Sequence, residues 1–392
     1  MKDSQLIAAG LTSNDALILT ELGAILLFLG IISFIAFRLS ISSVPLFLIV
    51  GLVFGNGGVI PLDLSGAFLN IGAQIGALLL LLLLGLEYSA RELGTTLRER
   101  WSVGVVDVLV NALPGAAIGL LVGWGWTGAV ILSGITYVSS SGIAAELIRE
   151  SGWQSSVVAK RTITVLALED LMLAPYLPFA SVLVAGASAL TGLISVSVAL
   201  LIVGLVLLLS VRRENLVSGL LNKHDSLSLL LTVFGTALLA AGAANLVGFS
   251  GAVAAFLIGL LLTGEVAASA RHRLSPLRDF FAAIFFLFFG LSTDPSDIPA
   301  ALPLALLLTV LGVFGKFFTG WWSSKDLSDQ MSWRRVGAFL IPRGEFSIVI
   351  AGLAVTAEFG TDLKAVTITY VILTTVTSSL LLRTFRSRLV NQ

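Results

Sequence analysis

Long apolar segments alternate with short polar or Gly/Pro-containing segments along almost the whole chain. A helix that crosses a bilayer needs about 20 consecutive, mostly apolar residues. Measured against that length, the sequence predicts thirteen membrane spans, at residues 16–37, 43–55, 66–88, 103–124, 127–148, 161–185, 189–211, 227–247, 249–264, 279–292, 298–320, 335–357 and 363–384. We therefore expect an all-α polytopic membrane protein, with no separate signal peptide and no soluble regulatory domain.

The composition agrees with this class. Of the 392 residues, 57% are hydrophobic and 12% are charged, whereas soluble domains carry about 25% charged residues. Basic and acidic residues number 23 each, so the charge balance indicates no nucleic-acid partner. The chain has no cysteine and only two histidines, His224 and His272. Disulfides and thiolate metal sites are excluded, and we expect no cofactor.

The distribution of basic residues predicts the topology, because cytoplasmic loops collect Lys and Arg. With the N-terminus outside, 19 of the 23 basic residues fall in inside loops, and only Lys2 and Lys364 fall outside. The remaining two, Lys316 and Arg343, lie within spans. We expect a multi-pass protein of the plasma (inner) membrane, with the N-terminus outside and the C-terminus in the cytoplasm.

An internal repeat relates the two halves of the chain. Three pairs of segments resemble one another in order: 48–52 with 256–260, 81–86 with 286–291, and 137–141 with 342–346. Spans 1–6 and 8–13 then form two halves joined by span 7, which turns the second half upside down. Chance similarity between Leu/Gly-rich spans is the alternative. Inverted repeats are typical of secondary transporters, whose site lies at the midplane between discontinuous helices.

Two spans carry residues that favour a break in mid-helix. Span 5 contains Thr136-Tyr137-Val138-Ser139-Ser140-Ser141-Gly142, and span 12 contains Ile341-Pro342-Arg343-Gly344-Glu345-Phe346. An unwound stretch in span 5 directs carbonyl and hydroxyl oxygens at a midplane ion, and oxygen ligands suit hard alkali cations. A face of small residues for helix packing is the alternative for span 5.

Five charged residues lie well inside spans, where each costs about 2.5–3.5 kcal/mol on insertion scales. They are Glu169, Asp170, Lys316, Arg343 and Glu345. A carboxylate at such a place can exchange a proton for a cation. A structural ion-pair cluster with Lys316 or Arg343 is the alternative for Glu169 and Asp170. We expect Lys316 to neutralise Asp170 or to stabilise broken helix ends, and Asp107 to lie at the membrane interface.

The ordered set of motifs resembles a known family. Val44–Gly55 and Ala73–Glu87, followed by Ser139-Ser140-Ser141, the Asp170 segment, Lys316 and Arg343-Gly344-Glu345-Phe346, are similar to the second family of monovalent cation:proton antiporters. That family includes the Kef-type potassium efflux systems. Relatives usually have Asp, Asn or Gln before the key aspartate, whereas this chain has Glu169.

The resemblance implies a fold and a mechanism. It implies a homodimer whose dimerisation domain comes from spans 1–3 and 8–10, at about 16–88 and 227–292. It implies a moving core from spans 4–6 and 11–13, at about 103–185 and 298–385, with 189–211 as a linker helix. Asp170 would bind proton and cation in turn during an elevator motion. A nucleotide-binding cytoplasmic regulator, if used, would be a separate subunit.

Residues and resemblance together predict an antiporter that exchanges a monovalent cation for protons, with potassium favoured and sodium possible. An alkali cation binds at Asp170, with Glu169, Thr136, Tyr137, Ser139, Ser140 and Ser141 as further site residues. Lys316, Arg343 and Glu345 balance charge or hold the structure.

Two rival functions belong to other classes. A channel or organic-anion symporter with a similar inverted fold would move its substrate without proton counterflow. An intramembrane enzyme such as an aspartyl protease needs two catalytic aspartates on facing helices, and the sequence shows no such pair. We therefore expect a transporter and not an enzyme.

Overall fold

The computed structural model describes residues 13–39, 43–55, 57–58, 66–87, 90–153, 155–184, 226–246, 251–262, 264–327, 329 and 331–386. All regular elements within these ranges are helical: α2 (Ser13–Leu39), α3 (Ser43–Phe54), α4 (Gly66–Glu87), α5 (Ala90–Leu121), α6 (Gly125–Tyr137), α7 (Ser141–Glu150), α8 (Val157–Val184), α11 (Ser226–Leu246), α12 (Gly251–Leu261), α13 (Gly264–Leu291), η1 (Pro295–Asp297), α14 (Ile298–Ser323), α15 (Ser332–Leu340), α16 (Glu345–Leu353) and α17 (Gly360–Arg386).

The helices agree with a polytopic membrane protein. In the described ranges, eight helices are long and apolar enough to cross a membrane, or up to ten if each bent pair counts as one span. Two shorter apolar helices, α3 and α12, match the short spans that we expected. The expected span at 189–211 lies outside the described residues, so the count of thirteen stays a prediction.

Two helices begin well before the spans that we expected from hydropathy. α5 begins at Ala90, with a kink at Arg100, and α13 begins at Gly264, whereas the apolar windows begin at 103 and 279. The expected loop containing Arg271, Arg273 and Arg278 is therefore part of α13. Hydropathy does not detect these extensions, because a polar sequence can be helical outside the apolar layer.

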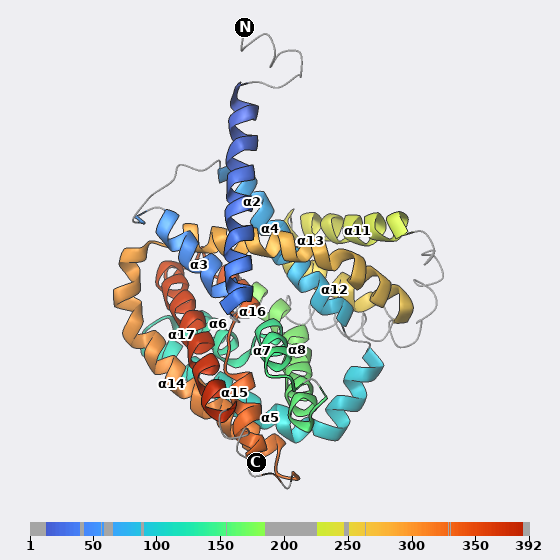
Figure 1. The fold of residues 1–392 in the computed structure, drawn as a ribbon, viewed down its shortest axis with the longest axis vertical. Helices are drawn as coiled ribbons and strands as arrows, with labels where there is room; N and C mark the ends of the chain where they lie inside the picture. The colour runs from blue at the N-terminus through green and yellow to red at the C-terminus, as the bar shows by residue number, and fades with distance from the viewer. Residues whose placement is uncertain are drawn as a thin grey trace.

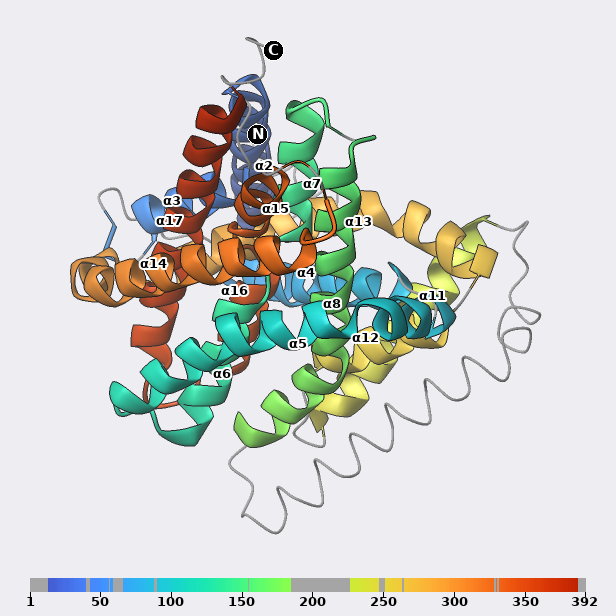
Figure 2. The same cartoon turned by 90° about the horizontal axis from the view of Figure 1, so that it is seen from below.

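The helices pack in two groups, which Figures 1 and 2 show from two directions. In the first group, α4 packs on α12 and α13, α3 packs on α13, and α11 packs on α12. In the second group, α5 packs on α6 and α14, and α14 packs on α15 and α17. α2 contacts α3, and Figure 1 shows it projecting beyond the other helices.

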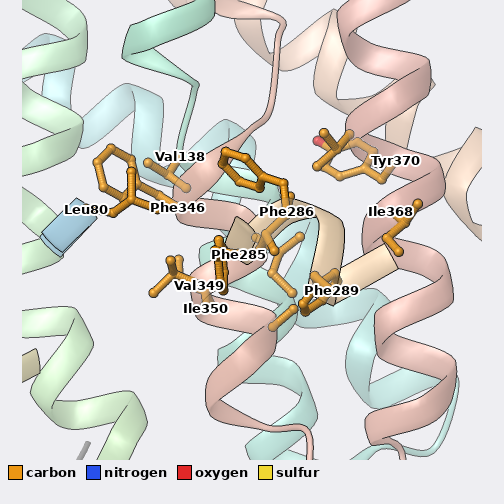
Figure 3. Packing of buried hydrophobic residues seen from close by; sticks show 14 of the residues in the cluster. Leu80, Val138, Phe285, Phe286, Phe289, Phe346, Val349, Ile350, Ile368 and Tyr370 are labelled. Carbon is orange, nitrogen blue, oxygen red and sulfur yellow. The ribbon is translucent and has the colours of Figure 1, made fainter. Parts of the chain in front are cut away.

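A large apolar cluster joins the two groups. In Figure 3, Phe285, Phe286 and Phe289 of α13 lie between side chains of α16, such as Val349, and Ile368 of α17. Each of these side chains is at most 7% exposed. The first group is therefore packed against α16, which begins at the span 12 break, and against α17.

Pairs of glycines let two helix crossings come very close. A Cβ at Gly51 of α3 would lie 2.7 Å from the Cα of Gly290 in α13. A Cβ at Gly85 of α4 would lie 2.9 Å from the Cα of Gly259 in α12. Under the repeat, Gly51 corresponds to Gly259 and Gly85 to Gly290, so the two crossings are equivalent. The positions of the four glycines thus agree with the internal repeat, and small residues at both crossings allow the helices to approach closely.

We expect Gly290→Ala to destabilise the protein by about 1–3 kcal/mol, because the added methyl meets the backbone of Leu48 and Gly51, which cannot yield as a side chain can. The measurement is thermal unfolding in detergent. Gly235→Ala in α11 is the control, since nothing lies within 4 Å of its Cβ. That variant should unfold at the wild-type temperature or above it. Equal melting of both variants would contradict the close crossing.

Candidate functional site

The two expected helix breaks are confirmed, and they meet. α6 ends at Tyr137 and α7 begins at Ser141, while α15 ends at Leu340 and α16 begins at Glu345. The axes of α15 and α16 differ by 41°. The non-helical segments are bonded across the break, since the Ser140 amide donates to the carbonyl of Pro342 at 2.8 Å. Backbone N–H and C=O groups inside a membrane must form hydrogen bonds within the protein. Here the two non-helical segments form such a bond with each other.

Arg343 binds the C-terminal ends of two helices. Its guanidinium donates to the Thr136 carbonyl at 2.7 and 3.2 Å, near the end of α6. It also donates to the Leu340 and Ile341 carbonyls at 2.9 and 2.8 Å, at the end of α15. Helix C-termini carry partial negative charge, so a buried cation is stabilised there. Arg343 is 0% exposed, and this geometry accounts for its burial.

Glu345 lies at the N-terminal ends of the partner half-helices. It is the first residue of α16, and its Oε2 accepts a hydrogen bond from Ser140 Oγ at 2.7 Å. Ser140 Oγ in turn accepts from the Ile143 amide at 3.2 Å in the first turn of α7. A carboxylate is favoured at helix N-termini. Arg343 and Glu345, which are two residues apart, thus stabilise opposite ends of the half-helices.

A buried ion-pair triad lies beside this crossing. Lys316 Nζ is 2.9 and 3.1 Å from the two carboxylate oxygens of Asp107, and 3.0 Å from Glu169 Oε1. Lys316 is 0% exposed and Asp107 is 1% exposed. Our expectation that Asp107 lies at the membrane interface is therefore wrong. Asp107 lies after the kink at Arg100 in α5, on the side that packs against α14.

Both carboxylates of the triad have further partners. Asp107 Oδ1 accepts from Thr319 Oγ1 at 2.7 Å and from Asn111 Nδ2 at 2.9 Å. Glu169 accepts from the Ser139 amide and, at 3.1 Å, from Ser139 Oγ. Glu169 therefore connects the triad to the span 5 break. Sequence reasoning missed Asn111 and Thr319; the one-turn spacing of Asp107 and Asn111 was a signal for a shared polar face.

Asp170 follows Glu169 on α8 and is 3% exposed. It ends the first half of α8, and the two halves, Val157–Asp170 and Pro175–Val184, differ in direction by 41°. Prolines at 175 and 178 lie in the second half and remove helix hydrogen bonds near the bend. Adjacent helical positions differ by about 100°, so Asp170 faces a different direction from Glu169.

The other expected site residues lie around the break. The Tyr137 ring centroid is 5.5 Å from Lys316 Nζ, and the buried Tyr137 hydroxyl has no hydrogen-bond partner in the described structure. Tyr137 is also within electrostatic reach of Asp170. The Thr136 hydroxyl is bonded to the Asn111 carbonyl at 2.9 Å. The structure thus brings Ser139, Tyr137 and Glu169 together, while Thr136 is occupied by the backbone.

A cavity of about 790 Å³ lies between the two helix groups and reaches the breaks. Ser141, Gly142 and Glu345 line its inner part, together with apolar residues of α2, α3 and α4. Charged side chains of α13 also line it, namely Arg271, Arg278 and Asp279. The cavity brings solvent-sized space next to the crossing of the broken helices.

Comparisons with known proteins agree with the fold and indicate the family. The family described as sodium/hydrogen exchanger, transmembrane, matches residues 23–385. The K(+)/H(+) antiporter subunit KhtU of Bacillus subtilis is 29% identical over 364 residues, covering 90% of each chain. The ammonium/H(+) antiporter subunit AmhT of Alkalihalophilus pseudofirmus is 30% identical over 342 residues, covering 85% of each.

Other matches are more partial or more distant. The glutathione-regulated potassium-efflux system protein KefC of Cronobacter sakazakii is 30% identical over 83% of this chain and 53% of its own length. Among solved structures, the sodium proton antiporter MjNhaP1 of Methanocaldococcus jannaschii matches with a TM-score of 0.68 and 19% identity, over 93% of this chain and 99% of that one. This likeness confirms the expected fold class.

Proposed function

Because the chain belongs to the sodium/hydrogen exchanger family and is a multi-pass monovalent cation:proton antiporter, we propose that it exchanges potassium for protons at Asp170. The observation that carries this proposal is an imbalance of buried charge. Three carboxylates, Asp107, Glu169 and Asp170, are buried on α5 and α8, whereas the buried cations of the described residues are Lys316 and Arg343.

Such an imbalance favours the uptake of positive charge. Isolated charges are costly inside a membrane, so excess carboxylates there need a cation or a proton. Lys316 is shared by Asp107 and Glu169. We propose that Asp170 binds a proton and a cation in turn, because it is buried at the point where α8 bends and lies within electrostatic reach of Tyr137 at the span 5 break. Competition of the two ligands for one group couples their exchange without a separate gate.

We assign distinct roles to the surrounding residues. Oxygens of the span 5 break, from Tyr137 to Ser141, complete the shell of a hard cation beside Asp170. Glu169, fixed by Lys316 and Ser139, is a positioning residue that holds α8 against the break. Arg343 and Glu345 neutralise the half-helix ends, so the cation meets no uncompensated helix dipole.

The two helix groups supply the moving and fixed parts of this proposal. The group of α5–α8 and α14–α17 is the transport core, and the group of α2–α4 and α11–α13 is the scaffold and the homodimer surface. In this proposal, ions reach Asp170 through the cavity between the two groups. We propose the plasma membrane as location, with the N-terminus outside and the C-terminus in the cytoplasm.

Potassium is favoured over sodium by the names of similar proteins. KhtU is named a K(+)/H(+) antiporter subunit, and KefC a potassium-efflux protein. The word subunit in the names of KhtU and AmhT also supports a separate regulatory partner for this chain. A cytoplasmic nucleotide-binding protein remains our proposal for that partner.

Proton release from acid-loaded proteoliposomes, followed with a pH-sensitive dye, tests the cation preference. We expect potassium and rubidium to drive proton release at lower concentrations than sodium does, because they share a similar size and hydration. Equal or stronger release by sodium would overturn the potassium assignment and leave the antiporter intact. A potassium current without proton counterflow would instead favour a channel.

A further inference from the structure

A second cavity, of about 370 Å³, lies where the chain passes from α14 to α15. It uses none of the residues assigned above. Side chains that line it include Trp321, Ser324, Lys325, Asp329, Trp333 and Arg334. The cavity therefore combines aromatic walls with two cations and one carboxylate.

The two cations of this cavity have no acidic partner among the described residues. Lys325 Nζ lies 3.2 Å from the Trp322 ring centroid and 4.4 Å from that of Trp321. The Arg334 guanidinium carbon lies 5.2 Å from the Trp333 ring centroid. Stacking on aromatic rings holds both side chains in place and leaves their charge available.

The nearby carboxylates are already bound to other groups. Asp326 pairs with Arg161 and with Arg100. Asp329 accepts from Arg335 at 3.2 Å and from Ser332 Oγ at 3.0 Å. Hydrogen bonding to the Met331 amide holds the pKa of Asp329 below its ordinary value. Asp329 is therefore an ionised partner of Arg335. This region thus has two acidic side chains and five basic ones, which are Arg100, Arg161, Lys325, Arg334 and Arg335. The positive charge that is not neutralised belongs to the two cations of the cavity, Lys325 and Arg334.

An unpartnered hydroxyl also belongs to this cavity. Ser324 is 6% exposed, and its Oγ has no hydrogen-bond partner in the described part of the chain. Its amide donates to the Trp321 carbonyl, so only the side chain lacks a partner. A buried hydroxyl without a partner is costly, and an acceptor oxygen in the cavity would satisfy it.

An apolar stripe on α14 leads to the cavity. Five exposed side chains follow one another at intervals of four residues: Leu302, Leu306, Val310, Phe314 and Phe318. Each step of four residues turns about 40° around the helix, so successive members are neighbours and the row winds slowly along the surface of α14. Figure 1 shows α14 at the outer edge of the molecule, and Phe314 is 70% exposed. A chain lying along this stripe ends at Trp321, where the cavity begins.

The geometry points to a binding site for an anionic phospholipid, with an acyl chain on the α14 stripe and the phosphate in the cavity. Lys325 and Arg334 bind the phosphate oxygens, and Ser324 Oγ donates to one of them. Tryptophans at the edge of the apolar layer are the usual neighbours of headgroups. The basic residues belong to the side that we expect to be cytoplasmic, where anionic lipids attract them.

Thermal unfolding and native mass spectrometry of the detergent-purified protein test this site. We expect added phosphatidylglycerol to raise the melting temperature more than phosphatidylcholine with the same acyl chains. Each of Lys325→Gln and Arg334→Gln should weaken phosphatidylglycerol binding about fivefold, and the double variant about 25-fold. The double variant R273A/R383A removes the same charge elsewhere and should bind as the wild type does.

Three outcomes would overturn the site. Equal shifts with both lipids would show that the headgroup charge is not recognised. Unchanged binding in the double variant would remove Lys325 and Arg334 from the site. An equal shift with inorganic phosphate alone would show an anion site without an acyl chain. The replaced side chains lie at the surface of the cavity, and the single variants extend the test if the double variant fails to fold.

Discussion

Asp170→Asn abolishes cation-dependent proton flux in proteoliposomes, reducing it to the level of empty liposomes. The amide keeps the shape of the carboxylate but can neither carry a proton nor offer a charge to a cation. The same change removes one negative charge from a cluster in which three buried carboxylates accompany Lys316 and Arg343. Because the amide keeps the size of the carboxylate and can still form hydrogen bonds, we expect the variant to be folded and to unfold close to the wild-type temperature.

Measuring both proton flux and thermal unfolding separates a loss of ion binding from a loss of structure. Asp362→Asn, at the exposed start of α17, is the control and should exchange ions as the wild type does. Retained exchange in Asp170→Asn would exclude Asp170 as the shared binding group. Loss of exchange together with a collapse of stability would show that Asp170 is a structural ion-pair member instead.

Lys316→Met should be the most destabilising single change in the core. The substitution leaves the carboxylates of Asp107 and Glu169, each within 3.1 Å of the removed ammonium, buried without their cation. Removal of one partner from a buried ion pair costs about 3–5 kcal/mol. Thermal unfolding in detergent measures the loss. Adding Glu169→Gln to Lys316→Met should recover part of it, because one uncompensated charge is removed.

Lys160→Met is the matched control for this measurement. Lys160 lies at the exposed start of α8, and its loss should change the free energy of unfolding by no more than about 0.5 kcal/mol. Wild-type melting of Lys316→Met would show that the triad contributes nothing net. A double variant that melts lower than Lys316→Met would show that Glu169 is held by Ser139 and not by Lys316.

The parts of the site that depend on local sequence were predictable. Glycine, proline and serine within apolar spans mark the two breaks, because these residues weaken a helix wherever it lies. The repeat also predicted that the breaks occupy equivalent positions. Their meeting at Ser140 and Pro342 follows from that equivalence.

Other parts depend on how distant helices pack, which hydropathy does not report. Asp107 and Lys316 are separated by 209 residues and meet because α5 packs on α14. From the sequence, we expected Arg343 and Glu345 only to balance charge or hold the structure. They bind opposite helix ends because Arg343 lies in the non-helical segment, whereas Glu345 begins α16.

The two glycine crossings bear on how a chain with two related halves evolves. In a dimer of one six-helix unit, the same gene would encode both crossings, and a single mutation would damage both at once. In this chain, Gly51 with Gly290 and Gly85 with Gly259 are encoded separately. A mutation now strikes one crossing and leaves the other intact. Fusion of the two units into one chain thus allows the sequences of the two halves to diverge. One half can then change its function while the other keeps the original helix packing.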